Sequence, residues 1–207
     1  MDKIKTGDLT RIYELDRAAI DEETRSVRLS FSSETPVERW FGEEVLVHNP
    51  ESVRLGRLND GAPLLFNHDL SDQVGRVESA TIDEKRRGQA VVRFSKSQRA
   101  QELYQDVLDG IVTNVSVGYR IHEMEQVEQD RELFIATDWE PHEISVVSVP
   151  ADSTVGIGRS REITGAHQTR VIRPQTIEEP KMSEETKVDV KVIENELRQK
   201  WQAEQDV

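Results

Sequence analysis

Residues 111–125, IVTNVSVGYRIHEME, decide the fold, because most of their apolar side chains recur with a period of two. One face of this stretch carries Thr113, Val115, Val117, Tyr119 and Ile121. The other face carries Asn114, Ser116, Gly118 and Arg120. The pattern predicts a β-strand with one face in a core, and it places Ser116 on the face opposite the valines.

The segment before this strand changes period and predicts a helix. In residues 95–110, SKSQRAQELYQDVLDG, one helical face collects Ala100, Leu103, Tyr104, Val107 and Leu108. Ser97 is suited to the N-cap of this helix and Gly110 to its C-terminal cap. No other segment of the chain predicts a helix as clearly.

Further strands are predicted on both sides of this helix and strand. Period-two patterns and turn residues delimit them at 11–20, 25–33, 62–69, 74–82 and 90–95, with one or two more within 134–152. The acidic turn at residues 21–24 joins the first two segments into a hairpin with one buried face. The predicted fold class is therefore α+β and rich in strands.

Composition indicates one compact domain with a polar extension. The chain has 207 residues, of which 35% are hydrophobic and 32% charged, so part of it is expected to lie outside a core. We predict a domain over residues 1–158 and, over 159–207, a flexible linker followed by a short helical segment. That segment, residues 188–207, is amphipathic through Val192, Leu197 and Trp201.

Charge and residue usage exclude several functions. The formal net charge of -13 repels phosphates, so no nucleic-acid partner is expected. The chain has no cysteine, which excludes disulfides, thiolate metal sites and a cysteine nucleophile. The first residues lack the apolar core of a signal peptide, and no stretch is long enough to span a bilayer. We therefore expect a soluble, intracellular protein with no membrane partner.

A serine hydrolase needs a nucleophile, a base within hydrogen-bond reach and a third group that orients the base. Ser116 is the candidate nucleophile, and His68 is the candidate base because it follows the apolar pattern LLFN at a turn. His48, in VLVHNP, has a similar setting. Glu143 precedes a run of valines, where a partly buried carboxylate needs a partner. On pattern alone a strand serine is more typical of packing, since no GxSxG motif surrounds Ser116.

Metal and nucleotide sites have little support in the sequence. The stretches HEMEQ at 122–126 and HEISV at 142–146 begin like the zinc motif HExxH, but neither has the second histidine. The glycines form neither a GxxxxGK nor a GxGxxG pattern. We therefore expect no metal and no cofactor.

Three ordered blocks of the sequence resemble one family. They are GAPLLFNHDLSDQVGRVESATID at 61–83, AVVRFSKSQRAQELYQDVLDGIVTNVSVGYRI at 90–121 and WEPHEISVVSVPAD at 139–152. In this order they resemble the tailed-phage prohead, or capsid maturation, serine proteases, whose fold is similar to that of the herpesvirus assemblin protease. The resemblance covers roughly residues 11–158. It implies an α+β fold with a β-barrel-like mixed sheet core and a few surrounding helices.

The resemblance also implies the roles of individual residues. Ser116 in NVSVGY matches the family's nucleophile, which lies on a strand, and His68 in NHD matches its catalytic histidine. The third member in assemblin is a second histidine before a short apolar strand, and Glu143 occupies the comparable position here. Asp152 and Asp69 are the alternatives for this role. A backbone N–H group at Ala151 or at Asp152 is a candidate oxyanion donor.

The implied function is that of a serine endopeptidase that cleaves scaffolding protein or a scaffold segment of the major capsid protein, and also itself. It would act in the host cytoplasm, inside the assembling procapsid, and a homodimer is an expected assembly because the assemblin relatives dimerise. Residues 159–207 are then a targeting, scaffold-like or self-cleaved tail, or a plain terminus. The alternative is a catalytically inactive capsid-assembly or scaffolding module with the same fold.

Overall fold

The computed structural model describes residues 2–14, 20–128, 133–148 and 168–172. The strands in these ranges are β1 (Asp2–Lys5), β2 (Leu9–Glu14), β3 (Ile20–Asp21), β4 (Ser26–Ser32), β5 (Val37–Arg39), β6 (Gly42–Leu46), β7 (Pro63–Phe66), β8 (Asp69–Ile82), β9 (Gly88–Phe94), β10 (Asn114–Glu128), β11 (Leu133–Val147) and β12 (Gln168–Ile172). The helices are α1 (Gly56–Asn59) and α2 (Gln98–Leu108).

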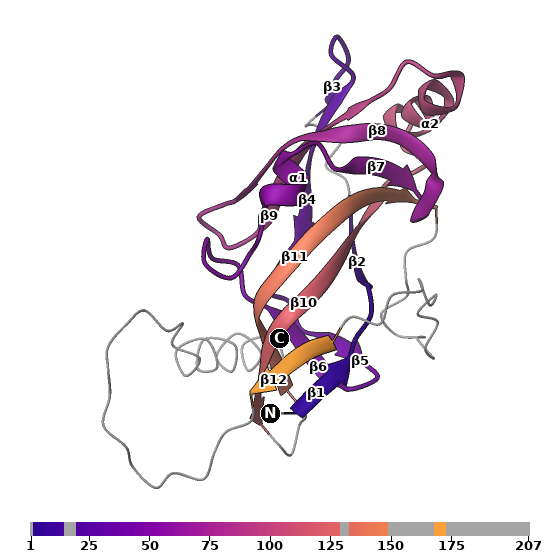
Figure 1. The fold of residues 1–207 in the computed structure, drawn as a ribbon. Coiled ribbons are helices and arrows are strands. Elements are labelled where there is room, and N and C mark those ends of the chain that lie inside the picture. The colour runs from indigo at the N-terminus through magenta and orange to yellow at the C-terminus, as the bar shows by residue number, and fades with distance from the viewer. Residues whose placement is uncertain (1, 15–19, 129–132, 149–167, 173–207) are drawn as a thin grey trace, which may run out of the picture.

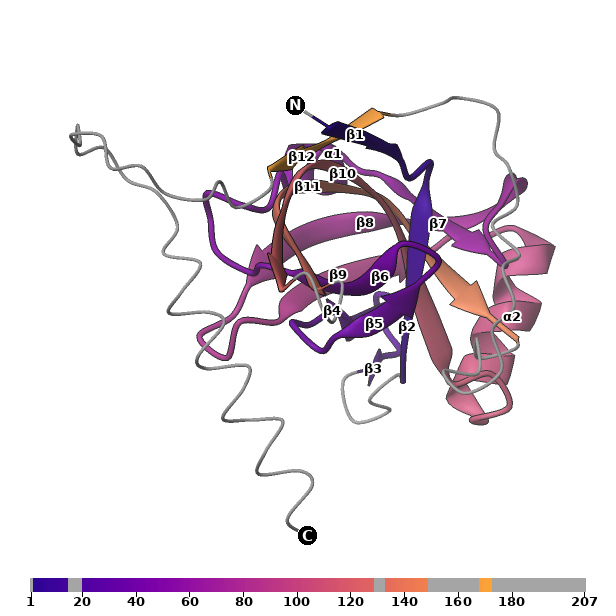
Figure 2. The same cartoon turned by 90° about the horizontal axis from the view of Figure 1, so that it is seen from below.

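The described strands form one mixed sheet that curls on itself into a half-barrel, as the view from below shows (Figure 2). The strand order is β1-β12-β10-β11-β7-β8-β9-β4-β3, while β2 pairs with β10, β6 with β11, and β5 with β6. Strand β11 runs parallel to β6 and β7, and β10 runs parallel to β12, whereas the other pairs are antiparallel. The expected barrel-like mixed sheet with few helices is confirmed.

Strands β10 and β11 are the longest of the described strands, with 15 residues each, and they pair along their length (Figure 1). The predicted core face of β10 is buried, with Val115, Val117, Tyr119 and Ile121 all 0% exposed. One or two strands were expected within residues 134–152, and the structure has a single strand there, β11, over Leu133–Val147. Several register shifts interrupt the pair, and such β-bulges increase local twist and help a sheet to curl.

Helix α2 has both predicted caps. The Ser97 hydroxyl accepts a hydrogen bond from the backbone N–H three residues later. Gly110 has a φ of 72°, and the N–H groups of Gly110 and Ile111 donate to the carbonyls of Val107 and Asp106. These two hydrogen bonds form the Schellman motif, in which glycine at the left-handed position ends the helix without a steric penalty. The helix prediction is confirmed.

The predicted first hairpin is partly wrong. Of the described residues of the first segment, only Ile20 pairs with β4, and it forms strand β3 together with Asp21 of the predicted turn. The longer strand β2 pairs instead with β10, from Leu9 opposite Tyr119 to Glu14 opposite Asn114. The two edges of β4 are already occupied by β9 and β3, so β2 finds its partner at the free edge of β10.

A buried polar cluster holds β2 and β6 together behind β10. Arg11 Nη2 donates to Glu44 Oε1 at 2.8 Å and to the Glu44 carbonyl at 2.9 Å. The Tyr119 hydroxyl donates to the same carboxylate oxygen at 2.5 Å and accepts from Arg39 at 2.6 Å. Burial and the neighbouring carboxylate raise the pKa of Tyr119, which keeps the phenol protonated and able to donate.

Strand β12 lies beyond residue 158, the predicted end of the domain. It pairs with β1 and β10, so residues 168–172 are part of the sheet. Thr169 and Val171 are buried, but a five-residue strand in a polar segment has too short a period-two pattern to be recognised.

The helix predicted at 188–207 lies outside the described residues, and the division at 158 stays a prediction. Within the described ranges no helix is both long and apolar enough to cross a bilayer.

Candidate active site

His68 lies in the tight turn that joins β7 to β8. Phe66 pairs with Asp69, so Asn67 and His68 are the two central residues of the hairpin. Their φ angles are 51° and 60°, and a type I′ turn requires positive φ at both positions. Asparagine and histidine are among the non-glycine residues most often found in this left-handed region. The turn therefore presents the His68 ring at the end of an apolar strand.

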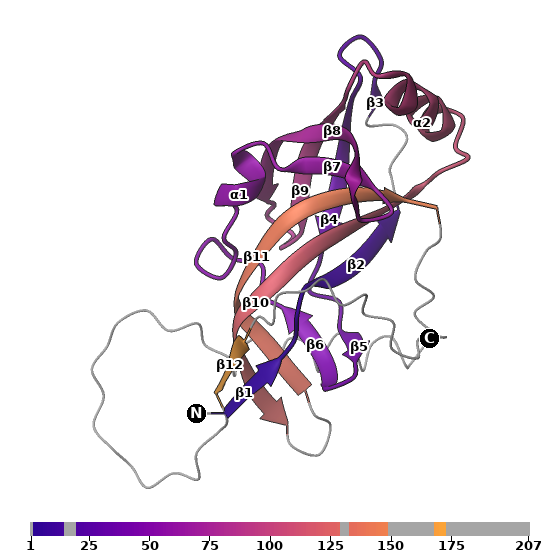
Figure 3. The same ribbon diagram turned by 45° about the vertical axis from the view of Figure 1, so that its right-hand side comes forward.

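The turn is anchored to the end of β11. The Asn67 N–H donates to the Val146 carbonyl at 2.9 Å, and the Asn67 side-chain oxygen accepts from the Ser148 N–H at 3.0 Å. Strand β7 also pairs in parallel with β11 over residues 144–146. These bonds bring the turn beside the end of β11, which pairs with the start of β10 (Figure 3).

Ser116 and Glu143 face the turn from neighbouring strands. Ser116 lies opposite Ser145, and Gly118 lies opposite Glu143, in the register of β10 and β11. A Cβ atom at Gly118 would lie 2.2 Å from Glu143 Oε1, closer than any real contact. Because Gly118 has no Cβ, the Glu143 carboxylate has room to lie against β10 at this position.

The His68 ring joins Ser116 to Glu143. Its Nε2 lies 2.8 Å from Ser116 Oγ, and its Nδ1 lies 2.6 Å from Glu143 Oε1. A carboxylate only accepts, so Nδ1 carries the proton and Nε2 accepts from the Ser116 hydroxyl. Ser116 and Glu143 are buried, whereas 26% of the His68 side chain is exposed. A base that contacts a nucleophile and is held in one tautomer by an acid is the geometry of a Ser-His-acid triad.

Ser145 belongs to the same cluster, and sequence reasoning missed it. Its hydroxyl donates to Glu143 Oε2 at 2.7 Å and accepts from the His68 backbone N–H at 3.1 Å. The side chain is fully buried. One signal was present in the sequence, because residues two apart on a strand share a face, and Ser145 follows Glu143 by two.

A β-bulge precedes Glu143. Gly118 lies opposite Glu143 but Tyr119 lies opposite Pro141, so His142 is the extra residue on β11. Bulges next to active sites re-aim side chains. Burial lowers the pKa of His142, which favours its neutral ring. The bulge thus changes the alternation of β11 immediately before Glu143, the carboxylate that is bonded to His68.

The other sequence candidates have different outcomes. Asp152 and the backbone donors expected at 151 and 152 lie outside the described residues. Asp69 accepts hydrogen bonds from the Ser71 N–H and hydroxyl. His48 is 1% exposed and its Nε2 lies 2.7 Å from Ser32 Oγ, so this ring is part of the interior. In the part of the chain that the structure describes, no group of three or more His, Asp or Glu side chains could hold a metal ion.

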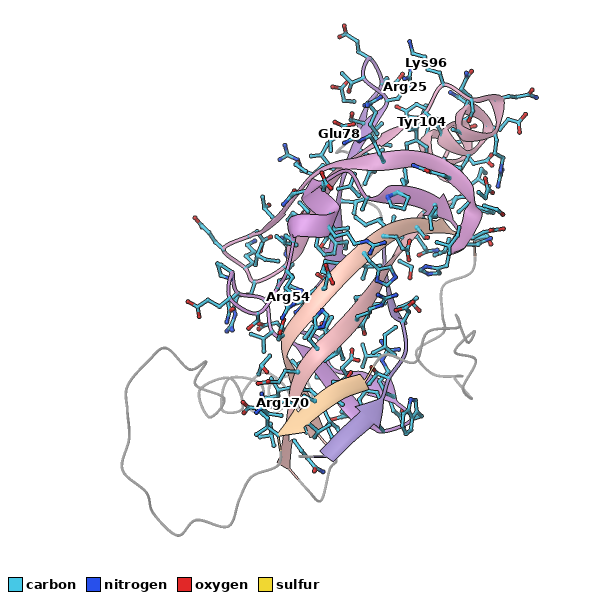
Figure 4. The ribbon with its side chains drawn as sticks, viewed as in Figure 1. Arg25, Arg54, Glu78, Lys96, Tyr104 and Arg170 are labelled. Atoms are coloured by element: carbon cyan, nitrogen blue, oxygen red, sulfur yellow. The ribbon has the colours of Figure 1, made fainter. Side chains whose placement is uncertain are left out.

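A hollow of about 560 Å³ lies elsewhere, beside α2 and the turn after β3. Arg25, Lys96 and Tyr104, which contribute to its lining, lie together at one end of the molecule (Figure 4). Neither Ser116, His68 nor Glu143 lines it. Its lining includes acidic and basic side chains but no serine or histidine, so it lacks the residue types of the Ser116–His68–Glu143 cluster.

Comparison with known proteins links this cluster to phage assembly. The sequence family described as caudovirus prohead serine protease matches residues 30–168, which include the turn and both strands of the cluster. The major capsid protein of Halomonas phage phiHAP-1 is similar to this chain, with 52% identity over 141 residues. The match covers 66% of this chain and 23% of that protein, so the chain spans under a quarter of the relative's length. No solved structure matches the chain.

Proposed function

Since this chain belongs to the caudovirus prohead serine protease family, we propose that it is a serine endopeptidase that acts during capsid maturation. The observation that carries the proposal is the His68 ring, which lies within hydrogen-bond distance of Ser116 on one side and of Glu143 on the other. These three residues come from a turn and two strands, far apart in the sequence. Their convergence supports nucleophilic catalysis more directly than any local motif does.

In the proposed mechanism, Ser116 Oγ attacks the carbonyl carbon of the scissile peptide bond. His68 Nε2 takes the hydroxyl proton and then gives it to the leaving amine, which produces an acyl-enzyme on Ser116. Water then attacks the acyl group, with His68 again acting as base. Glu143 holds the Nδ1–H tautomer and stabilises the imidazolium that forms in each step.

The proposed substrates are proteins of the immature capsid. The relative from phage phiHAP-1 is named a major capsid protein, and this chain matches only part of it, which supports a protease unit that acts on a capsid polypeptide or on a scaffold segment joined to it. Cleavage of the chain itself, within residues 159–207, belongs to the same proposal. The site of action is then the assembling procapsid in the host cytoplasm, and a homodimer is the assembly expected.

The second candidate function is a capsid-assembly or scaffolding module without hydrolysis. The capsid-protein name of the relative favours it. The site geometry favours the enzyme, because a module without activity has no need of a serine at 2.8 Å from an imidazole whose other nitrogen bonds a buried carboxylate. The two functions differ in one measurable property, the reactivity of Ser116.

The deciding experiment is labelling of the full chain with a fluorophosphonate probe. We expect the probe to attach to Ser116, with the modified residue located by mass spectrometry, and labelling to disappear in Ser116→Ala and in His68→Ala. Since Ser116 is fully buried, labelling also measures whether the probe reaches it. Ser32→Ala, which removes another buried serine hydroxyl bonded to a histidine, is the matched control and should label like the wild type.

Coexpression with the phage capsid and scaffolding proteins tests the substrate. The wild type should shorten one of them, and Ser116→Ala should not. Cleavage that persists in Ser116→Ala would remove the nucleophile assignment, and cleavage abolished by a chelator would replace the serine mechanism with a metal-dependent one. An intact fold without labelling or cleavage would favour the assembly module.

A further inference from the structure

We propose that Ser145 is a positioning residue that holds the His68 turn and the Glu143 carboxylate in the geometry of proton transfer. The inference rests on the proposed serine endopeptidase function and concerns the same site. In this role Ser145 does not contact a reacting atom. It acts through His68 and Glu143.

The contacts of one hydroxyl carry the inference. Ser145 Oγ donates its proton to Glu143 Oε2 at 2.7 Å and accepts from the His68 N–H at 3.1 Å. The second carboxylate oxygen, Oε1, accepts from His68 Nδ1 at 2.6 Å. Glu143 is therefore held at both oxygens, and the same hydroxyl that holds it also holds the main chain of its partner.

The position of Ser145 explains how one side chain reaches both groups. It lies directly opposite Ser116 on β10 and directly beside Leu65 on β7. Residues 144–146 of β11 all pair with both β10 and β7, and Ser145 is the residue among them that shares the face of Glu143. A small hydroxyl side chain fits there without displacing the ring of His68.

Both held groups can move when Ser145 is removed. The terminal torsion of a glutamate is broad, so a carboxylate bonded at one oxygen can rotate away from Nδ1. His68 has a φ of 60°, a conformation that costs energy for a residue with a side chain and persists only when its surroundings fix it. Loss of the hydroxyl would also leave a buried carboxylate oxygen and a backbone N–H without this partner.

The Glu143–His68 bond is therefore predicted to weaken in Ser145→Ala. We expect kcat for peptide cleavage to fall by about 10-fold to 100-fold with little change in KM, because a small displacement of a catalytic group affects the chemical step. Ser145→Thr keeps the hydroxyl and should recover most of kcat. The control Ser32→Ala removes a hydroxyl of equal burial that bonds His48, and it should keep kcat per folded molecule.

A double-mutant cycle separates positioning from packing. If Ser145 acts through Glu143, Ser145→Ala should reduce kcat by less than about twofold in a Glu143→Gln background, since coupled residues are not additive. Equal reductions of kcat in both backgrounds would overturn the proposal, as would a wild-type kcat in Ser145→Ala. This comparison remains decisive even if Ser145→Thr does not fold.

A spectroscopic measurement decides the inference independently of hydrolysis. The His68 Nδ1 proton should give a far-downfield ¹H NMR signal in the full chain, identified by its absence in His68→Ala. We expect Ser145→Ala to increase its exchange with water at least about 10-fold, while Ser32→Ala leaves it unchanged. Unchanged exchange in Ser145→Ala would overturn the inference. If the wild type cleaves nothing, the proposed function fails, but this signal still tests Ser145.

Discussion

Two serine–histidine pairs lie in the part of the chain that the structure describes, and only one of them has the geometry of a Ser-His-acid triad. His68 Nε2 lies 2.8 Å from Ser116 Oγ, and His48 Nε2 lies 2.7 Å from Ser32 Oγ. Each ring has an acceptor at Nδ1, so each imidazole has the same tautomer and accepts from its serine. By the distance between nucleophile and base, the two pairs are equivalent.

The pairs differ in what lies behind the ring and in what covers it. Behind His68 is the Glu143 carboxylate, which can stabilise an imidazolium, whereas behind His48 is the neutral carbonyl of Leu46 at 2.8 Å. The His68 side chain is 26% exposed, and His48 is 1% exposed and in ring contact with Trp139. Contact between a serine and a histidine is therefore insufficient for nucleophilic catalysis. The histidine also needs a charged partner behind its ring and exposure that lets a substrate approach.

The largest predicted difference between the pairs is in activity. His68→Ala should lower kcat for cleavage by about 10⁴-fold while the protein stays folded, because the proposed general base is lost. His48→Ala should instead lower the free energy of unfolding by about 2–5 kcal/mol, since it opens a cavity and leaves buried Ser32 without this partner. Kinetics normalised to the folded fraction, together with urea unfolding, measure both effects. A catalytic loss of equal size in His48→Ala would remove the distinction between the pairs.

The next difference is in acid stability. Burial lowers the pKa of His48 from 6.5 to about 4, against the opposing effect of its hydrogen bond to the Leu46 carbonyl. Between these two values the unfolded state binds more protons than the folded state. The contribution of neutral His48 to the free energy of unfolding is thus complete above pH 6.5 and is lost as the pH falls towards 4. Below pH 4 the loss levels off. The shift corresponds to about 3 kcal/mol.

Denaturant unfolding at pH 7 and pH 4 measures this contribution. Carboxylates also titrate in this window, so the informative quantity is the difference between the wild type and His48→Gln. We expect the wild type to lose about 3 kcal/mol more than the variant on acidification. Parallel losses in the two proteins would mean that His48 is not the neutral, buried group described above.

The smallest predicted difference concerns the glycine beside each pair. A Cβ at Gly118 would collide with the Glu143 carboxylate at 2.2 Å, and a Cβ at Gly88 would collide with Ser32 Oγ at 2.3 Å. Gly118→Ala should lower kcat about tenfold, because the acid is pushed from its position. Gly88→Ala should lower the free energy of unfolding by about 1–3 kcal/mol with kcat unchanged. Steady-state kinetics and unfolding curves of both variants test the pair, and an unchanged kcat in Gly118→Ala would contradict the packing argument.

Much of the local structure was predictable, and the physical reason is that its signals are local. The period-two pattern around Ser116 depends on neighbouring side chains, and the caps at Ser97 and Gly110 depend on a few residues of backbone. The pairing of β2 was mispredicted, because a turn signal nearby does not exclude a partner about a hundred residues away. Strand β12 was missed for a similar reason, since its partners lie in distant segments.

The sequence by itself determined the strand that carries Ser116, the helix that precedes it and a short set of candidates. His48 and His68 had similar settings by pattern, and the family resemblance favoured His68 together with Ser116 and Glu143. The tertiary structure decided which histidine meets which serine and what lies behind each ring. It also revealed Ser145 and the space at Gly118. These features depend on the register of β10 and β11 and on a turn bonded to the end of β11, 75 or more residues away along the chain. No pattern within a single segment encodes such a contact, because a strand sets only the face of its side chains and the sheet sets what they meet.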